Sequence, residues 1–317
     1  MKTILFVLSL ILHDVLCQNS STISTVSQTV PTSMVPAPPN VTEGTGGAWI
    51  RVLGRSGRIV IGNRRNPDDD ERRITLEYES IQEFDQSGTG INLRDHYLRN
   101  FAGRDFSFGT TREQLFQNLT TRSFDFQGRI QDTFNAQLVS NVYIFRDSGN
   151  VTNGNETFPV RRGNIKFGFD ITNWRFCGGD GGATCRMGNR QYEGAGIDLT
   201  LRIRGPRAPR ERSRDQRRGR GIRGGRDFDI GEGRNIILSS KVQYDGSNTF
   251  EDMEDGYPRL VTRGSSTFFI FRFRRFNTSA TYDPIVDLSA SSDTPNNAVI
   301  KTSAPILLLS MFVMNFL

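Results

Sequence analysis

Apolar and polar residues alternate with a period of two along much of the chain between residues 48 and 283. The alternation is clearest over residues 74–79, 165–172, 197–204 and 269–274, where Ile, Leu, Tyr or Phe occupies every second position. A strand with one face packed on a core shows this period, whereas an amphipathic helix shows a period of 3.6. The pattern therefore predicts half-buried β-strands.

Six further segments have a strand-forming composition, and turn signals of Gly, Asn and Asp separate them. Two segments, 93–101 and 111–119, are expected to form short helices. Roughly ten strands with short connections favour an antiparallel β-sandwich or a partly closed barrel. The expected fold class is thus all-β with minor helix, in a single domain over 48–283. The six further strands are expected at residues 58–62, 122–127, 138–145, 157–160, 235–244 and 259–262.

The composition places the chain among globular proteins. Of its 317 residues, 36% are apolar and 23% are charged, too apolar for a wholly disordered chain and too polar for a protein with many membrane spans. Its 23 Phe are expected to fill the space between the sheets, an interpretation favoured over an aromatic ligand cage. Of the 40 basic residues four are Lys, which leaves 36 Arg.

Both ends of the chain carry targeting signals. Residues 1–17 combine one basic residue, a short apolar run and small residues at the cleavage site, as a secretory signal peptide does. The apolar tail at 304–317 follows a polar linker over 284–303 that contains small residues, the order typical of a GPI-anchor signal. This order predicts that the protein is held at the cell surface by a lipid anchor or secreted into the extracellular matrix. The alternative for the apolar tail is a short membrane-spanning helix. The anchor is expected on Ser291 or Ser292.

The sequons and cysteines agree with an extracellular location. Residues 18–47 are rich in Ser, Thr and Pro and are expected to form a glycosylated lead. Cys177 and Cys185 bracket a Gly-rich loop, and in a secreted protein such a pair favours a disulfide. A redox or metal-binding pair is the alternative, although it usually needs CxxC spacing or more ligands. N-glycosylation is expected at the sequons of Asn19, Asn40, Asn118, Asn150, Asn155 and Asn277.

Residues 202–226 form the most basic part of the chain. They contain eleven Arg against Glu211 and Asp215, a charge of +9, so the rest of a chain with net charge +6 sums to −3. Because the segment has two Pro, several Gly and few large apolar residues, it is expected to be a long, disordered loop. Its guanidinium groups suit sulfate, phosphate and carboxylate. The predicted polyanion-binding residues are Arg207, Arg210, Arg212, Arg214, Arg217, Arg218, Arg220 and Arg223.

The expected partners of this loop are extracellular polyanions, namely sulfated glycans, acidic matrix proteins or a mineral surface. The Arg-Gly ending resembles an RNA-binding segment, but secretion argues against nucleic acid as the partner. Two alternatives stay open for the segment: a solvated insertion without a partner, or a protease processing site at residues 214–218.

No catalytic, cofactor-binding or metal-binding site is predicted. The mature chain has one histidine, His96, and no nucleophile elbow, phosphate-binding loop or zinc-protease motif occurs. Acidic clusters at residues 68–71, 227–232 and 251–255 have the chemistry for Ca²⁺ binding or glycoside hydrolysis. Adjacent acids among arginines are, however, more often solvated turns. A non-enzymatic protein is expected, with a lectin-like binding module as the alternative.

The run from Phe167 to Cys177 ends in Asn-Trp-Arg-Phe-Cys and is followed by the Gly-rich cysteine loop and the strand at 196–203. This arrangement resembles the uncharacterised skeletal organic matrix proteins of stony corals, over residues 49–276. The resemblance implies a secreted or surface-attached glycoprotein of a calcified skeleton, acting as a structural or adhesive matrix component. It implies no functional residues. The basic composition departs from that of acidic mineral-matrix proteins and favours anionic partners over Ca²⁺.

Overall fold

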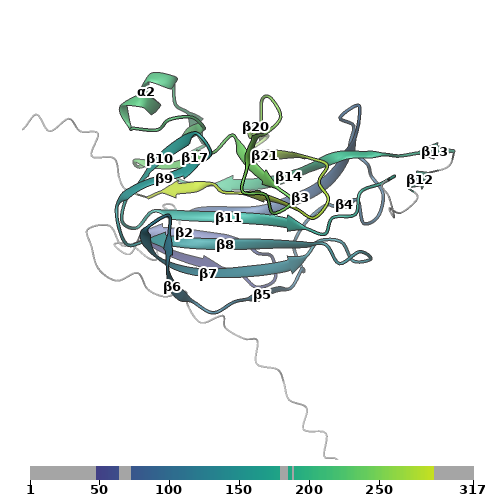
Figure 1. Ribbon diagram of the computed structural model, residues 1–317, viewed down its shortest axis with the longest axis horizontal. Coiled ribbons are helices and arrows are strands. Elements are labelled where there is room, and N and C mark those ends of the chain that lie inside the picture. The colour runs from purple at the N-terminus through teal and green to yellow at the C-terminus, as the bar shows by residue number, and fades with distance from the viewer. Residues whose placement is uncertain (1–47, 64–72, 179–184, 188, 289–317) are drawn as a thin grey trace, which may run out of the picture. The chain divides into compact units, whose positions relative to one another are not determined.

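The computed structural model describes residues 48–63, 73–178, 185–187 and 189–288, and its strands belong to two large sheets and two separate hairpins (Figure 1). All strand pairs are antiparallel within the described part of the chain, and neither large sheet closes into a barrel there. The predicted all-β antiparallel class is therefore confirmed in its sandwich form. The strands are shorter and more numerous than the ten expected, running from β1 to β23.

The first large sheet is built around two long strands, each with the alternating burial that the sequence predicts. Their pairing shifts register near Thr200, which lets inward-facing residues stay on one face. In spatial order the sheet contains β1 (Ala48–Val52), β2 (Ile59–Asn63), β3 (Ile74–Asp85), β14 (Gly194–Arg204), β21 (Ser266–Arg274) and β20 (Arg259–Arg263), with β4 (Tyr97–Leu98) on β3.

The second large sheet branches at one strand, β11 (Ile165–Thr172), which pairs with three others. Its main path is β15 (Arg210–Glu211), β16 (Arg226–Gly231), β17 (Arg234–Leu238), β23 (Ile285–Asp287), β11, β22 (Ser279–Tyr282), β18 (Lys241–Tyr244) and β19 (Phe250–Asp252). Its branch contains β8 (Gln137–Phe145), β7 (Leu119–Arg129), β5 (Phe106–Phe108) and β6 (Arg112–Phe116).

Two short hairpins are separate from these sheets in their strand pairing. They are β9 (Gly149–Asn153) with β10 (Glu156–Val160), and β12 (Arg186–Met187) with β13 (Arg190–Gln191).

Phenylalanine fills the space between the large sheets, as expected from the composition. Phe169 of β11 lies 5.3 Å from Phe271 of β21, measured between ring centroids, and 5.3 Å from Tyr282. Phe228 of β16 lies 5.0 Å from Phe269 of β21. These edge-to-face and tilted contacts join side chains of both sheets into one buried cluster.

The two lysines of the described part are both ion-paired. Lys166 is 2% exposed in its side chain, bonds to Asp283 at 2.5 Å, and has its amine 4.4 Å and 4.8 Å from the ring centroids of Phe116 and Tyr143. Lys241 bonds to Asp252 at 2.6 Å, with 12% of its side chain exposed. The carboxylate partners of both amines, and the aromatic rings beside Lys166, offset the cost of removing these amines from water.

The two expected helices are wrong. Residues 93–101 contain β4 and are interrupted by Asp95 at φ 68°. Residues 111–119 contain the edge strand β6, which a turn at Gln117 and Asn118, both with positive φ, joins to β7. In both segments sheet pairing outweighed a weak helix propensity. Helix occurs instead at α2 (Arg214–Gly219), inside the Arg-rich segment.

The predicted signal peptide, lead and C-terminal anchor signal lie outside the described residues. Within those residues no helix is long and apolar enough to cross a membrane. The described part begins at β1, and β23 lies beyond the expected domain end at residue 283. β23 pairs with β17 and β11, so it belongs to the second sheet rather than to a linker.

Candidate polyanion-binding site

The Arg-rich segment is ordered, in contrast to the disordered loop that was expected. Its first residues complete β14, and β15 and α2 follow. Ser213 caps α2: its hydroxyl accepts the Gln216 backbone N–H, and the Gln216 side chain accepts the Ser213 N–H. This capping box is a local helix signal that the basic composition obscured.

After α2 the chain turns back and runs beside β10. Ile222 is 2% exposed and packs in an apolar cluster that includes Phe158. Gly224 and Gly225 have φ values of 79° and 60°. A Cβ atom on Gly225 would lie 2.6 Å from the Leu238 carbonyl oxygen, so only glycine fits there.

A buried carboxylate fixes this returning chain. Glu156 accepts the backbone N–H groups of Gly225 at 2.7 Å and Ser240 at 3.1 Å. It also accepts the hydroxyls of Ser239 and Ser240, each at 2.5 Å. The sequence prediction missed Glu156, although its alternation with Phe158 placed this acid on the buried face of β10.

Four of the eight predicted arginines are ion-paired with acids that lie outside or at the edge of the helix. These pairs neutralise the arginines and hold the segment against the second sheet, which is the physical reason why it is not a disordered loop. The pairs are Arg207 with Asp229; Arg212 with Asp227 at 3.5 Å and Asp229 at 3.4 Å; Arg217 with Glu211 at 3.5 Å; and Arg220 with Asp287 at 2.8 Å and Asp227 at 3.4 Å.

Asp227 lies at the centre of these contacts and is fully buried. Burial raises its pKa to about 6, against the opposing effect of Arg220 and Arg212. Asp287 and Asp229 contribute to this raised pKa, because a nearby negative charge disfavours ionisation.

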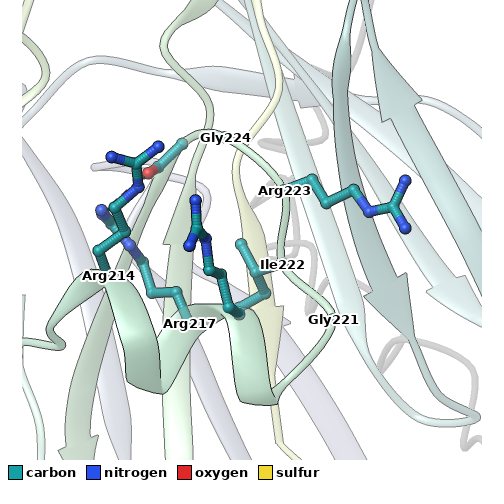
Figure 2. A pocket seen from close by; sticks show the side chains of 8 residues that line it. Arg214, Arg217, Gly221, Ile222, Arg223 and Gly224 are labelled. Carbon is teal, nitrogen blue, oxygen red and sulfur yellow. Dashed lines mark hydrogen bonds between the residues drawn. The ribbon is translucent and has the colours of Figure 1, made fainter.

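The other four predicted arginines are exposed: Arg210, Arg214, Arg218 and Arg223. Among the described residues, no acid lies within ion-pair distance of them. Three of the four line a pocket of about 610 Å³ together with Arg217 and residues 221–225 (Figure 2). Arg210 lies in β15, opposite Asp229 in the strand register and outside this pocket.

The pocket has the chemistry of an anion site. Guanidinium groups are planar, permanently charged donors that fit sulfate, phosphate and carboxylate oxygens in pairs. Ile222 and the glycines between the arginines supply backbone and little else, so among the pocket residues no side chain can serve as a nucleophile or a base. The arrangement therefore presents several donors that suit an oxyanion.

Most acids of the clusters considered for Ca²⁺ or catalysis are ion-paired where the structure describes them. Asp227 and Asp229 pair with arginines, as above. Glu251 pairs with Arg274 at 2.7 Å and Asp252 pairs with Lys241. The cluster at 68–71 lies outside the described residues.

The expected disulfide between Cys177 and Cys185 is present, and it is buried beside His96. Nδ1 of His96 lies 2.7 Å from a carboxylate oxygen of Glu83, and Nε2 lies 3.2 Å from the Cys185 sulfur. Glu83 also accepts the Trp174 indole N–H at 3.0 Å and the Cys177 N–H at 2.7 Å.

Through these contacts the Glu83 carboxylate connects His96, Trp174 and the disulfide loop. One imidazole nitrogen and two sulfurs lie within 4.8 Å of one another, a grouping that soft metals favour. The sulfurs are bonded to each other, however, and only free thiolates ligate metal, so the group could hold a metal only after reduction.

Four of the six predicted glycosylation sites are described, and all four asparagines are exposed: Asn118, Asn150, Asn155 and Asn277. Asn19, Asn40 and the expected anchor residues Ser291 and Ser292 lie outside the described residues.

No solved structure matches the chain. The family model for the acidic skeletal organic matrix protein matches residues 40–317, which is most of the chain. The protein therefore belongs to the acidic skeletal organic matrix protein family.

Proposed function

We propose that this skeletal organic matrix protein is a non-enzymatic, N-glycosylated component that binds polyanionic partners through the exposed arginines of the α2 pocket. The observation that carries the proposal is a contrast between neighbouring arginines. Arg212, Arg217 and Arg220 are neutralised by acids, whereas Arg214, Arg218 and Arg223 reach solvent without an ion-paired acid in the described part of the chain.

The charge of the chain supports anionic partners. The family name denotes acidic matrix proteins, whereas this chain has a net charge of +6. Opposite net charges attract at long range and speed association. Acidic matrix polypeptides and sulfated glycans therefore form the proposed partner class. The proposal includes attachment to the cell surface through a GPI anchor on Ser291 or Ser292, for which the order of segments at the C-terminus is the support.

The proposal is tested by retention of the secreted chain on immobilised heparin and on immobilised poly-aspartate. We expect the triple variant Arg214→Gln, Arg218→Gln, Arg223→Gln to bind roughly tenfold to a hundredfold more weakly, because each exposed ion pair contributes up to about 1 kcal/mol. Retention of the unaltered chain should also fall as salt is raised.

The matched control removes the same charge elsewhere. Arg51, Arg55 and Arg94 are exposed, and their replacement by Gln changes the net charge equally. We expect this control to bind nearly as tightly as the unaltered chain. Equal loss in both triple variants would show that net charge, rather than the pocket, governs binding and would refute the proposed site.

The processing alternative at residues 214–218 fits the structure less well. Proteolytic nicking is concentrated at exposed, extended loop tips, and these residues form most of α2.

A further inference from the structure

Arg223, which lines the arginine pocket beside α2, is connected through β10 to a glycosylation sequon on β9. Thr157 of β10 and Arg223 exchange two backbone hydrogen bonds, with N···O distances of 2.8 and 2.9 Å. The returning chain therefore acts as a third strand beside the β9–β10 hairpin. On the other side of β10, Asn150 lies opposite Pro159, and Thr152 lies opposite Thr157.

The two faces of this three-stranded unit differ sharply. Val151, Phe158, Val160 and Ile222 point to one face, where they are buried in an apolar cluster. Residues directly opposite each other in antiparallel strands point to the same face, and so do residues two apart on a strand. The opposite face therefore carries the side chains of Asn150, Thr152, Thr157, Pro159 and Arg223, of which Asn150, Thr152 and Arg223 are exposed.

Arg223 differs in direction from the other labelled arginines of the pocket. Figure 2 shows its side chain extending to the side opposite Arg214 and Arg217. Strand spacing of about 4.8 Å and a rise of about 3.3 Å per residue place the Asn150 and Arg223 backbones roughly 12 Å apart on this face. An extended arginine and the first sugars of a glycan together reach across such a gap.

We propose that an N-linked glycan on Asn150 lies over Arg223 and shields its guanidinium group from solvent and from polyanions. The sugar hydroxyl and acetamido oxygens are acceptors for guanidinium donors, which otherwise have no acidic partner among the described residues. Glycan occupancy at Asn150 would then set how many arginines the pocket offers. The shielding rests on the N-glycosylation in the proposed function, and its consequence for binding rests also on the proposed polyanion site.

The shielding is tested with two variants at the third sequon position. Thr152→Ser keeps the glycan acceptor sequence and Thr152→Ala destroys it, while both change one exposed side chain. Each variant is secreted from glycosylating eukaryotic cells and treated with phenylglyoxal, and the modified arginines are quantified by peptide mass spectrometry. We expect Asn150 to be occupied in Thr152→Ser and Arg223 to react several-fold faster in Thr152→Ala.

Arg214 and Arg218 provide the internal reference, because their reactivity should be the same in both variants. An unoccupied Asn150 in Thr152→Ser, or equal reactivity of Arg223 in the two variants, would overturn the proposal. Equal thermal melting of the variants excludes unfolding as the cause of a difference.

Heparin retention separates this inference from the proposed function. Thr152→Ala should be retained more strongly than Thr152→Ser, and the difference should vanish when Arg223→Gln is added to both. If the pocket triple variant loses retention while the Thr152 variants are retained equally, glycan control fails and the pocket stands. If Arg223 is shielded but the triple variant binds normally, the pocket fails and the shielding stands.

Discussion

Single buried carboxylates decide whether the arginine pocket keeps its shape. Glu156 holds the chain that returns from α2, and Asp227 pairs with Arg212 and Arg220 of the same segment. Neither is exposed, so neither can bind the proposed partner. Their effect on binding is indirect and passes through the position of the backbone.

Replacing Glu156 with Gln should destabilise the fold by about 3 kcal/mol, because an amide places donors against the hydroxyl and N–H groups that the carboxylate accepts. Urea unfolding followed by tryptophan fluorescence measures this loss. Glu113→Gln is the control: Glu113 pairs with Arg146 at an exposed position, and its loss should cost little. Equal unfolding midpoints for Glu156→Gln and the unaltered protein would contradict the assigned role.

Asp227 should make stability depend on pH in an unusual direction. Its pKa is raised from 3.8 to about 6 in the folded protein, so the folded state holds this proton more tightly than the unfolded chain. Its contribution to stability therefore falls as pH rises through that window. Asp227→Asn cannot titrate, so its stability relative to the unaltered protein should improve from about pH 4 to about pH 7.

Asp132 offers a control of opposite sign. Its hydrogen bond with Arg104 lowers its pKa, so its contribution is present at higher pH and is lost on acidification. Asp132→Asn should accordingly lose relative stability as pH rises, by a small amount because the site is half exposed. Parallel trends for the two variants in urea unfolding would count against the buried Asp227 assignment.

At the level of elements, the strands follow from the sequence because their signal is local. The alternation over 165–172 corresponds to β11, and the segment expected at 235–244 contains β17 and β18. The short edge strand β6 lacks such alternation, and its pairing depends on a turn. The order of the Arg-rich segment depends on acids distant in sequence, such as Asp287, 67 residues from Arg220. Composition alone therefore indicated disorder.

The cap of α2 can be tested separately from the rest of the fold. Ser213→Ala removes the side-chain acceptor for Gln216 and should cost about 1 kcal/mol of local stability, whereas Ser213→Thr keeps an acceptor. Because α2 buries no side chain, the global unfolding midpoint should hardly change. Hydrogen exchange should be faster over 214–219 in Ser213→Ala. The same exchange in the Ala and Thr variants would mean that the cap does not hold the helix.

For the whole molecule, the sequence shows that the excess positive charge lies in residues 202–226, but it does not show which of those arginines remain without an acidic partner. The segment of charge +9 is partly neutralised by Asp227, Asp229 and Asp287, which belong to the second sheet. What faces solvent is a smaller set of arginines at the end of the domain where α2 adjoins the β9–β10 hairpin (Figure 1). The likeness of the chain to skeletal matrix proteins was also visible in the sequence, whereas the sites that hold the pocket together required the fold.

The shielding of Lys166 and Lys241 has a consequence for covalent chemistry. Both amines are engaged by carboxylates, and the other two lysines, Lys2 and Lys301, lie toward the ends of the chain. The described part of this basic protein thus presents arginine at its surface and almost no free amine. Aldehydes, activated esters and amine-oxidising enzymes, which join proteins through lysine, should therefore act poorly on this part of the chain. Its contacts with a matrix are expected to be non-covalent and to weaken as salt is raised.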